Sequence, residues 1–212
     1  MEAFAIVLGS RNRKKVRELA DLMGLDGIAW RSLDDFPGIP AVEESGATFA
    51  ENARLKAQTY ARAVGRWVLA EDSGLEVDAL GGEPGVYSSR FAGEPADDAR
   101  NNALLLERLR DVPDDERTAR FVCHMVLSRP DGTVAAETFA VCRGTILREL
   151  RGTGGFGYDP LFEIREYHRT LAELGPAVKS CISHRARAAR AMTPHLWKLA
   201  AGHPRAVTQD RV

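Results

Sequence analysis

Short apolar runs alternate along the chain with longer segments in which apolar residues recur every three or four positions. The short runs are typical of buried strands, and the longer spacing is typical of helices with one buried face. The segments that predict strands are Phe4–Leu8, Ile28–Leu33, Trp67–Ala70 and a short stretch near Leu161 and Phe162. The spacing predicts helices that follow Gly9–Arg13, Thr48, Asp97, Thr170 and Ser183. This order of elements favours an α/β fold.

Two further segments alternate between apolar and polar residues at every position. Arg117–Ser128 and Thr133–Leu147 both follow this pattern, and Pro130-Asp131-Gly132 lies between them as a turn. Two such segments joined by a short turn predict a β-hairpin. A hairpin requires antiparallel pairing, so the sheet is expected to be mixed.

The chain has 212 residues and contains no internal repeat, low-complexity tract or linker. We therefore expect one domain over residues 1–201 and a polar tail over 202–212. No apolar run approaches the roughly 20 residues that span a membrane, and the N-terminus lacks the pattern of a signal peptide. The three cysteines are widely spaced, which favours a reducing cytoplasm over a disulfide framework or a zinc site.

The charges nearly cancel, with 29 Lys and Arg against 30 Asp and Glu. This balance argues against sequence-independent binding to DNA or RNA, which needs a basic surplus. Only five of the cations are lysines, so the position of each lysine is informative.

A basic segment, Ser10-Arg11-Asn12-Arg13-Lys14-Lys15, separates the first predicted strand from the first helix. Free N–H groups and the positive end of the helix dipole favour phosphate at such a point. Arg13, Lys14 and Lys15 oppose the dipole here, and a bound anion would compensate them. The Walker pattern is absent. The alternative is a solvated basic turn.

Two acidic pairs are the next candidates. Glu71 and Asp72 follow the third predicted strand directly and precede Ser73, whereas Glu43 and Glu44 lie in a loop. Ligands of α/β folds bind at the carboxyl ends of strands, and Mg²⁺ prefers one or two carboxylates together with substrate phosphates. The pairs could supply a metal ligand and a general base. Surface loops are often acidic, however, so the case is stronger for Asp72 than for Glu43 and Glu44.

A glycine-rich segment, Gly152 to Pro160, matches Gly-x-Gly-x-x-Gly, but Pro160 stands where a dinucleotide-binding helix would continue. The segment is better interpreted as a tight loop that presents Phe156 and Asp159 to a base. Lys179 and Ser183-His184-Arg185 offer further hydrogen-bond donors near the start of the last helix. The alternatives are a plain strand connection and a basic helix end.

In this order the segments resemble the inosine triphosphate pyrophosphatase family, the dITP/XTP pyrophosphatases, from about Ile6 to about Trp197. The matching motifs are Ser10-x-Asn12-x-x-Lys15-x-x-Glu18, Glu43-Glu44-Ser45-Gly46 with the following helix, Glu71-Asp72-Ser73-Gly74-Leu75, Gly154 to Pro160, and Ser183-His184-Arg185. Glu71 stands where the family usually has Asp, and the tail after Ala201 has no family counterpart.

The resemblance implies an elongated mixed α/β fold with an active-site cleft between two lobes, and a homodimer. It implies hydrolysis of ITP, dITP and XTP to the nucleoside monophosphate and pyrophosphate with Mg²⁺. Asp72 would be the general base and a metal ligand, and Glu43 or Glu44 would assist with the metal. The substrate-binding residues would be Ser10, Arg11, Asn12, Arg13, Lys14, Lys15, Ser73, Phe156, Gly157, Tyr158, Asp159, Lys179, His184 and Arg185.

Two other functions remain open at this point. The segment Ser10-Arg11-Asn12-Arg13 is loosely similar to the first loop of the Maf-like nucleotide pyrophosphatases, although the later motifs argue against that family. A nucleotide sensor without turnover would keep the pocket, but the presence of Asp72 and the Glu43-Glu44 pair argues against it.

Overall fold

One mixed sheet of seven strands runs through the computed structural model, which describes residues 4–25 and 27–202. The sheet order is β2-β1-β3-β4-β5-β6-β7. The strands are β1 (Ala5–Leu8), β2 (Ala29–Ser32), β3 (Trp67–Val77), β4 (Thr118–Ser128), β5 (Val134–Ile146), β6 (Phe162–Ile164) and β7 (Arg169–Thr170). β1 pairs in parallel with β2 and β3, and all later pairs are antiparallel, which confirms the predicted mixed sheet.

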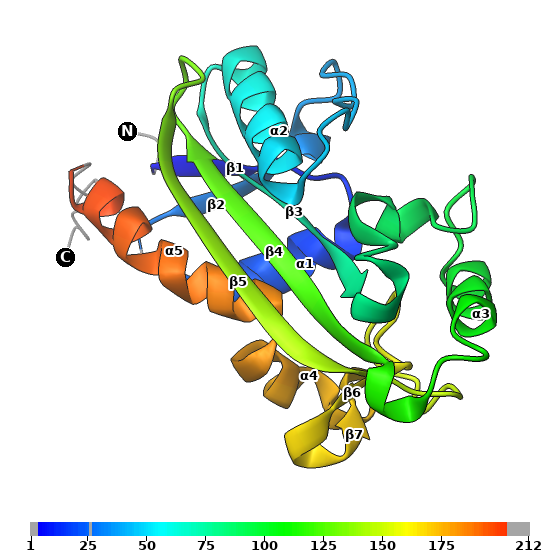
Figure 1. Cartoon of the computed structure of the whole chain (residues 1–212). Coiled ribbons are helices and arrows are strands. Elements are labelled where there is room, and N and C mark those ends of the chain that lie inside the picture. The colour runs from blue at the N-terminus through cyan, green and yellow to red at the C-terminus, as the bar shows by residue number, and fades with distance from the viewer. Residues whose placement is uncertain (1–3, 26, 203–212) are drawn as a thin grey trace.

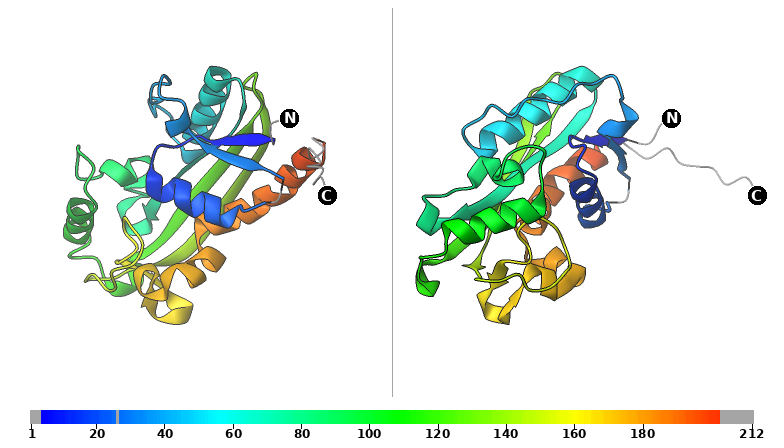
Figure 2. Two further views of the ribbon diagram at one scale, coloured as in Figure 1. Left: turned by 180° about the vertical axis from the view of Figure 1, so that it is seen from behind. Right: turned by 90° about the vertical axis from the view of Figure 1, so that its right-hand side faces the viewer.

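Five α-helices surround this sheet in the described residues (Figure 1). They are α1 (Arg13–Leu22), α2 (Phe49–Val64), α3 (Asp98–Arg108), α4 (Leu171–Ile182) and α5 (His184–Ala201). α2 covers one face of the sheet, while α1 and α5 lie together on the other face, as the view from behind shows (Figure 2). Within the described residues, no helix is both long enough and apolar enough to cross a membrane.

The two faces of the sheet bury different residues of the same strands. Ile6 and Leu8 pack with the helices α1 and α5, whereas Val7 between them packs with α2. This follows from the strand geometry, in which successive side chains point to opposite faces.

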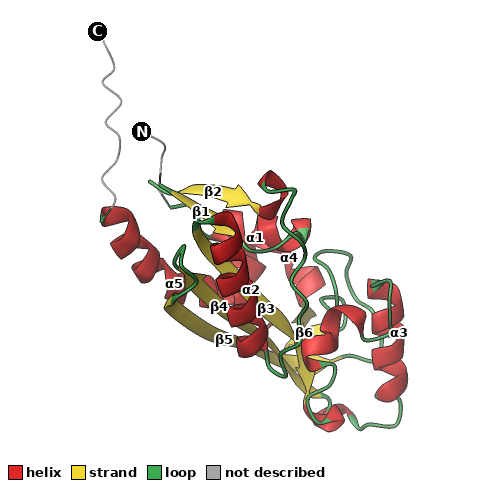
Figure 3. Ribbon diagram, turned by 90° about the horizontal axis from the view of Figure 1, so that it is seen from above, coloured by secondary structure: helices red, strands yellow, loops and turns green. Residues whose placement is uncertain are grey.

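A third apolar cluster forms a second lobe at the far end of the long strands. It joins the last part of β3 and the first part of β4 to α3, α4 and β6. α3 lies at the opposite end of the molecule from the last turns of α5 (Figure 3). Arg117 is buried inside this lobe and donates hydrogen bonds to the carbonyl oxygens of Leu109, Ile146 and Leu147. These bonds compensate the cost of burying a guanidinium group.

Helix starts agree with the capping residues expected from the sequence. Thr48, Asp97, Thr170 and Ser183 each accept a hydrogen bond from a backbone N–H of the first turn of their helices. The helix after Thr170 is longer than expected, however, because it resumes after Leu174. Gly175 has a left-handed φ of 74° and breaks the helix before Pro176, and the second part carries Lys179.

The third strand also differs from the expectation that it ends at Ala70. β3 continues to Val77 because its residues from Val68 onward pair with β4 without interruption. The charged residues Glu71 and Asp72 therefore lie in the middle of a strand rather than after its end. They stand just past Leu69, where the parallel pairing with β1 stops.

Candidate functional site

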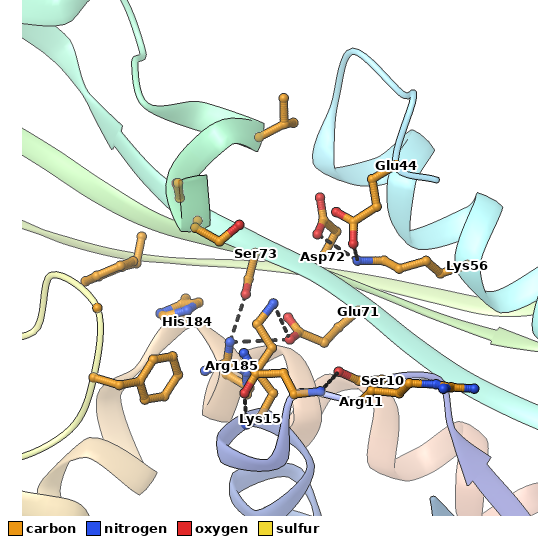
Figure 4. A pocket seen from close by; sticks show the side chains of 18 of the residues that line it. Ser10, Arg11, Lys15, Glu44, Lys56, Glu71, Asp72, Ser73, His184 and Arg185 are labelled. Carbon is orange, nitrogen blue, oxygen red and sulfur yellow. Dashed lines mark hydrogen bonds and ion pairs between the residues drawn. The ribbon is translucent and has the colours of Figure 1, made fainter. Parts of the chain in front are cut away.

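A cavity of ≈ 340 Å³ opens between the two lobes, and it brings together segments that are far apart in the sequence (Figure 4). Its wall contains the start of α1, the middle of β3, the start of α3, the loop before β6, the end of α4 and the start of α5. The residues expected at a site that line it are Ser10, Arg11, Asn12, Lys15, Glu44, Asp72, Ser73, Phe156, Gly157, Tyr158, Asp159, Lys179, His184 and Arg185.

The basic segment forms the N-terminus of α1. Asn12 is the N-cap, and its Oδ1 accepts hydrogen bonds from the backbone N–H groups of Lys14, at 3.1 Å, and Lys15, at 3.2 Å. Lys15 reaches inward to Glu71, whereas Arg11 donates to the carbonyl oxygen of Ile39. The side chain of Arg13 lies outside the described part of the structure. The cap thus holds the lysine-bearing turn at the edge of the cavity.

The middle of β3 sends consecutive side chains to opposite faces of the sheet. Asp72 points toward α2, while Glu71 and Ser73 point toward α5 (Figure 4). This alternation follows from the period of two in a strand. One strand therefore supplies two separate polar clusters, and both lie at the same cavity.

The first cluster consists of Asp72, Glu44 and Lys56. The Nζ of Lys56 lies 2.8 Å from Oδ1 of Asp72 and 3.1 Å from Oε1 of Glu44. The other carboxylate oxygen of Asp72, Oδ2, is buried and has no hydrogen-bond partner. Burial raises the pKa of Asp72, and the positive charge of Lys56 holds back part of that rise.

The second cluster is centred on Glu71, whose side chain is 1% exposed. Its Oε1 accepts from Lys15 at 3.1 Å and from Arg185 at 3.3 Å, and the thiol of Cys123 donates to Oε2 at 3.4 Å. Burial opposes the ionisation of Glu71, but the charges of Arg185 and Lys15 outweigh it and hold its pKa well below the usual range. Arg185 also donates to Ser73 at 2.8 Å and pairs with Glu18 at 2.7 Å.

The glycine-rich loop is held by Asp159, which lies buried beneath it. Oδ2 of Asp159 accepts from the backbone N–H of Phe156 at 2.9 Å and from the Nζ of Lys179 at 2.6 Å. Lys179 also lies 4.6 Å from the centre of the Phe156 ring. The hydroxyl of Tyr158 donates to the carbonyl oxygen of Ser88 at 2.8 Å, so it holds the far wall of the cavity.

His184 and Arg185 begin α5 directly after the cap Ser183. The His184 ring stacks on Phe121, with 4.8 Å between ring centres, and burial lowers its pKa well below the ordinary value. The imidazole is therefore neutral near pH 7. Nδ1 of His184 and Nε of Arg185 are buried and have no hydrogen-bond partner. These two atoms remain able to pair with a polar group of a ligand.

The structure separates Glu43 from Glu44. Glu44 lines the cavity and contacts Lys56, whereas Glu43 is exposed and lies outside the wall. Lys14 is also largely exposed, and its Nζ lies 3.4 Å from Asp98 and 5.6 Å from the centre of the Phe156 ring.

Four charged residues of the wall or its support were not among the site residues expected from the sequence: Lys56, Glu71, Glu18 and Asp98. Glu71 was named only as a member of an acidic pair. The rarity of lysine was a usable signal for Lys56, and the Glu18 position was part of the first motif. No local signal distinguishes Asp98 from Asp97 beside it. Among the described residues, no three His, Cys, Asp or Glu side chains form a ready metal-binding group.

Comparisons with known proteins agree with this geometry. A model of the Ham1 family matches residues 6–195. A dITP/XTP pyrophosphatase of Desulforamulus reducens is 54% identical over 183 residues, covering 86% of this chain and 90% of that protein. Its counterpart of Rhodopirellula baltica is 50% identical over 196 residues, covering 92% and 94%.

Solved structures show the same fold. A HAM1 protein from Coxiella burnetii superposes with a TM-score of 0.85 at 40% identity, covering 92% of this chain and 99% of that one. A nucleoside-triphosphatase / dITP/XTP pyrophosphatase from Mycobacterium abscessus gives a TM-score of 0.74 at 44% identity, covering 90% and 99%. Since the family model spans nearly the whole chain and close relatives are covered almost completely, this chain belongs to the Ham1 family.

Proposed function

We propose that this protein hydrolyses the non-standard purine nucleoside triphosphates ITP, dITP and XTP to the nucleoside monophosphate and pyrophosphate. It would thereby remove them from the nucleotide pool. The observation that carries the proposal is the carboxylate of Asp72, which is buried at the cavity with one oxygen on Lys56 and the other unpartnered. The names of the close relatives, dITP/XTP pyrophosphatases, support the substrate class.

The start of α1 supplies the binding site for the triphosphate in this proposal. Ser10, Asn12 and Lys15 line the cavity at a helix N-terminus, where backbone N–H groups and the helix dipole favour anions. No acidic residue lies in the first turn of α1 itself, and its lysines pair with Asp98 and Glu71 of other elements. Lys14 and Arg11 stand at the outer edge of the same turn, where they add positive charge.

Asp72 and Glu44 are the residues that would hold Mg²⁺. Both carboxylates lie beside Lys56, and the unpartnered Oδ2 of Asp72 is a vacant ligand atom of the type that Mg²⁺ prefers. When bound, the ion would neutralise charge on the phosphates. Glu43 is too exposed to share this role, so the structure favours Glu44 within the pair.

The reaction needs a water molecule to attack phosphorus while the bond between the monophosphate and the pyrophosphate breaks. Ionised Asp72 can accept the proton of that water because its carboxylate offers about four lone-pair sites, of which Lys56 and the metal ion would each use one. Lys15 and Lys56 offset the negative charge that develops on the phosphate oxygens. We therefore assign Asp72 as the general base.

The opposite end of the cavity would bind the purine. Phe156 offers a face for stacking, and the buried donors of Lys179, His184 and Arg185 surround it. A 6-oxo group accepts hydrogen bonds, whereas the 6-amino group of adenine donates them. Adenine would therefore leave buried donors unpaired, which is a strong basis for discrimination.

A substrate panel tests this function. With Mg²⁺ present, we expect release of pyrophosphate from ITP, dITP and XTP, and little from GTP or ATP, because only the first group presents the 6-oxo edge without the 2-amino group of guanine or the 6-amino group of adenine. Pyrophosphate is measured with a coupled assay. Equal rates on all five nucleotides would contradict the proposed selectivity, and binding without turnover would favour a sensor.

Lys56 is expected to set the pH range of the reaction through its effect on the pKa of Asp72. A general base must be ionised, so the rate falls as the pH drops through the pKa of Asp72. Lys56→Met removes the charge that lowers this pKa, and we expect the acid limb of the kcat/KM profile for ITP to move to higher pH. Arg62→Met, a cation on the exposed side of the same helix, serves as the control. An unmoved acid limb in Lys56→Met would remove Asp72 as the titrating base.

Two further parts of the proposal concern the surroundings of the protein. We propose a homodimer, supported by the exposed aromatic residues Tyr87 and Phe139, which flank one hollow of the surface. We also propose a cytoplasmic location, supported by three cysteines that are all free thiols.

A further inference from the structure

Asp98 links the two substrate-binding ends of the cavity. It is the first residue of α3, and its side chain is half exposed at the cavity wall. Its Oδ2 accepts from the backbone N–H of Gly157 at 3.0 Å, in the loop proposed to bind the base. The same oxygen lies 3.4 Å from the Nζ of Lys14, in the turn proposed to bind the phosphates.

Asp98 is not the capping residue of α3. The N-cap of α3 is the preceding residue, Asp97, whose Oδ1 accepts from the N–H of Arg100 at 2.9 Å. Asp97 is exposed and does not line the cavity. The carboxylate of Asp98 is therefore available for another purpose, although it also benefits from the positive end of the helix dipole.

The start of α3 is anchored firmly to the base loop. Asn102, one turn along the helix, is buried, and its Nδ2 donates both to the carbonyl oxygen of Asp98 at 2.7 Å and to that of Gly157 at 2.9 Å. Gly157 has a left-handed φ of 62°, and no heavy atom lies within 4 Å of the place where a Cβ would stand. Apart from its chain neighbours, Gly157 therefore has open space where a side chain would stand.

A nucleotide that spans the cavity places its sugar between the base and the phosphates. The base end is marked by Phe156 and Gly157, and the phosphate end by the first turn of α1. Asp98 contacts both ends and lies between them. Among the contacts of the described residues, its two side-chain bonds both use Oδ2, which leaves Oδ1 able to accept from a ligand.

We propose that Asp98 binds the sugar of the substrate by accepting a hydrogen bond from its 3′-hydroxyl group. This inference rests on the proposed function, in which ribonucleotides and deoxyribonucleotides are both substrates. The 3′-hydroxyl is the secondary hydroxyl that the two sugars share, so a residue that serves both must use it. A carboxylate is a strong acceptor for such a donor.

The test compares dITP with 2′,3′-dideoxyinosine triphosphate, which differs only by the absence of the 3′-hydroxyl. For the unmodified protein, we expect kcat/KM to fall about 10- to 100-fold with the dideoxy substrate, since a hydrogen bond to a charged group is lost. For Asp98→Ala, the two substrates should differ by less than about 3-fold. The ratio is taken within one protein sample, so partial unfolding of a variant does not change it.

Three further variants separate this role from others. Asp97→Ser keeps a capping side chain on the same helix and should retain the full preference for dITP. Lys14→Met removes the ion pair of Asp98 without removing its carboxylate and should also retain the preference. Asp98→Asn keeps an acceptor oxygen and should give an intermediate ratio.

The outcomes distinguish this inference from the proposed function itself. Absence of pyrophosphate release from dITP by the unmodified protein would overturn the function. Efficient release from dITP, with a dITP preference that Asp98→Ala leaves intact, would overturn the role of Asp98 alone. Equal losses of rate on both substrates in Asp98→Ala would show that the residue only holds the Gly157 loop, and would also overturn the proposal.

Discussion

Replacing Asp72 with asparagine is expected to lower the rate of pyrophosphate release from ITP by about 10²- to 10⁴-fold, the range that a positioned general base contributes. Asparagine keeps the shape of the side chain but cannot accept the proton of the attacking water. It also removes the negative charge from the vacant ligand atom proposed for Mg²⁺. The measurement is kcat in a coupled pyrophosphate assay at saturating ITP.

The residual rate of Asp72→Asn should also lose its acid limb, because the titrating group is gone. A suitable control is Asp78→Asn. Asp78 follows the last residue of β3 directly, and it accepts a hydrogen bond from the hydroxyl of Thr118 outside the cavity. This variant is expected to keep nearly full activity. An Asp72→Asn variant with the unmodified rate would show that another group removes the proton.

The largest expected effect on stability is that of Glu71→Gln. We expect the free energy of unfolding at pH 7 to fall by about 3 kcal/mol, because removing one partner of a buried ion pair leaves the other charge uncompensated. Arg185 is 2% exposed, and among the described residues it keeps Glu18 and Ser73 as its hydrogen-bond partners. The measurement is urea unfolding at one fixed protein concentration, with an unchanged m-value as the check on two-state behaviour.

The control for Glu71→Gln is the same kind of substitution in an ion pair at the surface. Glu137→Gln breaks an ion pair with Arg54 that is partly exposed on both sides, and it should cost at most about 1 kcal/mol. A loss for Glu71→Gln as small as that for Glu137→Gln would show that the Glu71 charge does not stabilise the fold.

The effect of Glu71→Gln should depend on pH in a direction set by the pKa of Glu71. Its pKa in the folded protein is well below the ordinary value of 4.5. Its charge therefore contributes its full stabilisation above about pH 4.5, and that contribution is lost as the pH falls toward the folded-state pKa. The difference in unfolding free energy between the unmodified protein and Glu71→Gln should narrow over this acidic range.

Local patterns along the chain were sufficient for most elements of the fold. The hairpin of β4 and β5, the mixed sheet and the helix caps at Thr48, Asp97 and Ser183 all depend on residues close in sequence. The strand β3 was predicted too short because Glu71 and Asp72 break its apolar run. The long pairing with β4, which no local pattern contains, keeps these residues in the strand.

The segments of the site were also visible in the sequence, because each combines an unusual density of polar groups with glycine or a helix start. The sequence by itself marked most of the segments that line the cavity, but not the start of α3 or the middle of α2. The resemblance implied the chemistry that is proposed for them. The sequence could not choose between Glu43 and Glu44, it named Glu71 only as a member of an acidic pair, and it gave no role to Lys56 or Asp98.

Which charged groups surround these side chains was decided only by the tertiary structure, and the physical reason is distance along the chain. Glu18 and Arg185 form an ion pair across 167 positions, and Lys14 meets Asp98 across 84. Whether a charged side chain is a base, a partner of a buried cation or an exposed residue depends on which groups surround it after folding. The sequence specifies the side chains and their local direction, whereas burial and charge partners, which set their pKa values and their roles, arise when the two lobes close around the cavity.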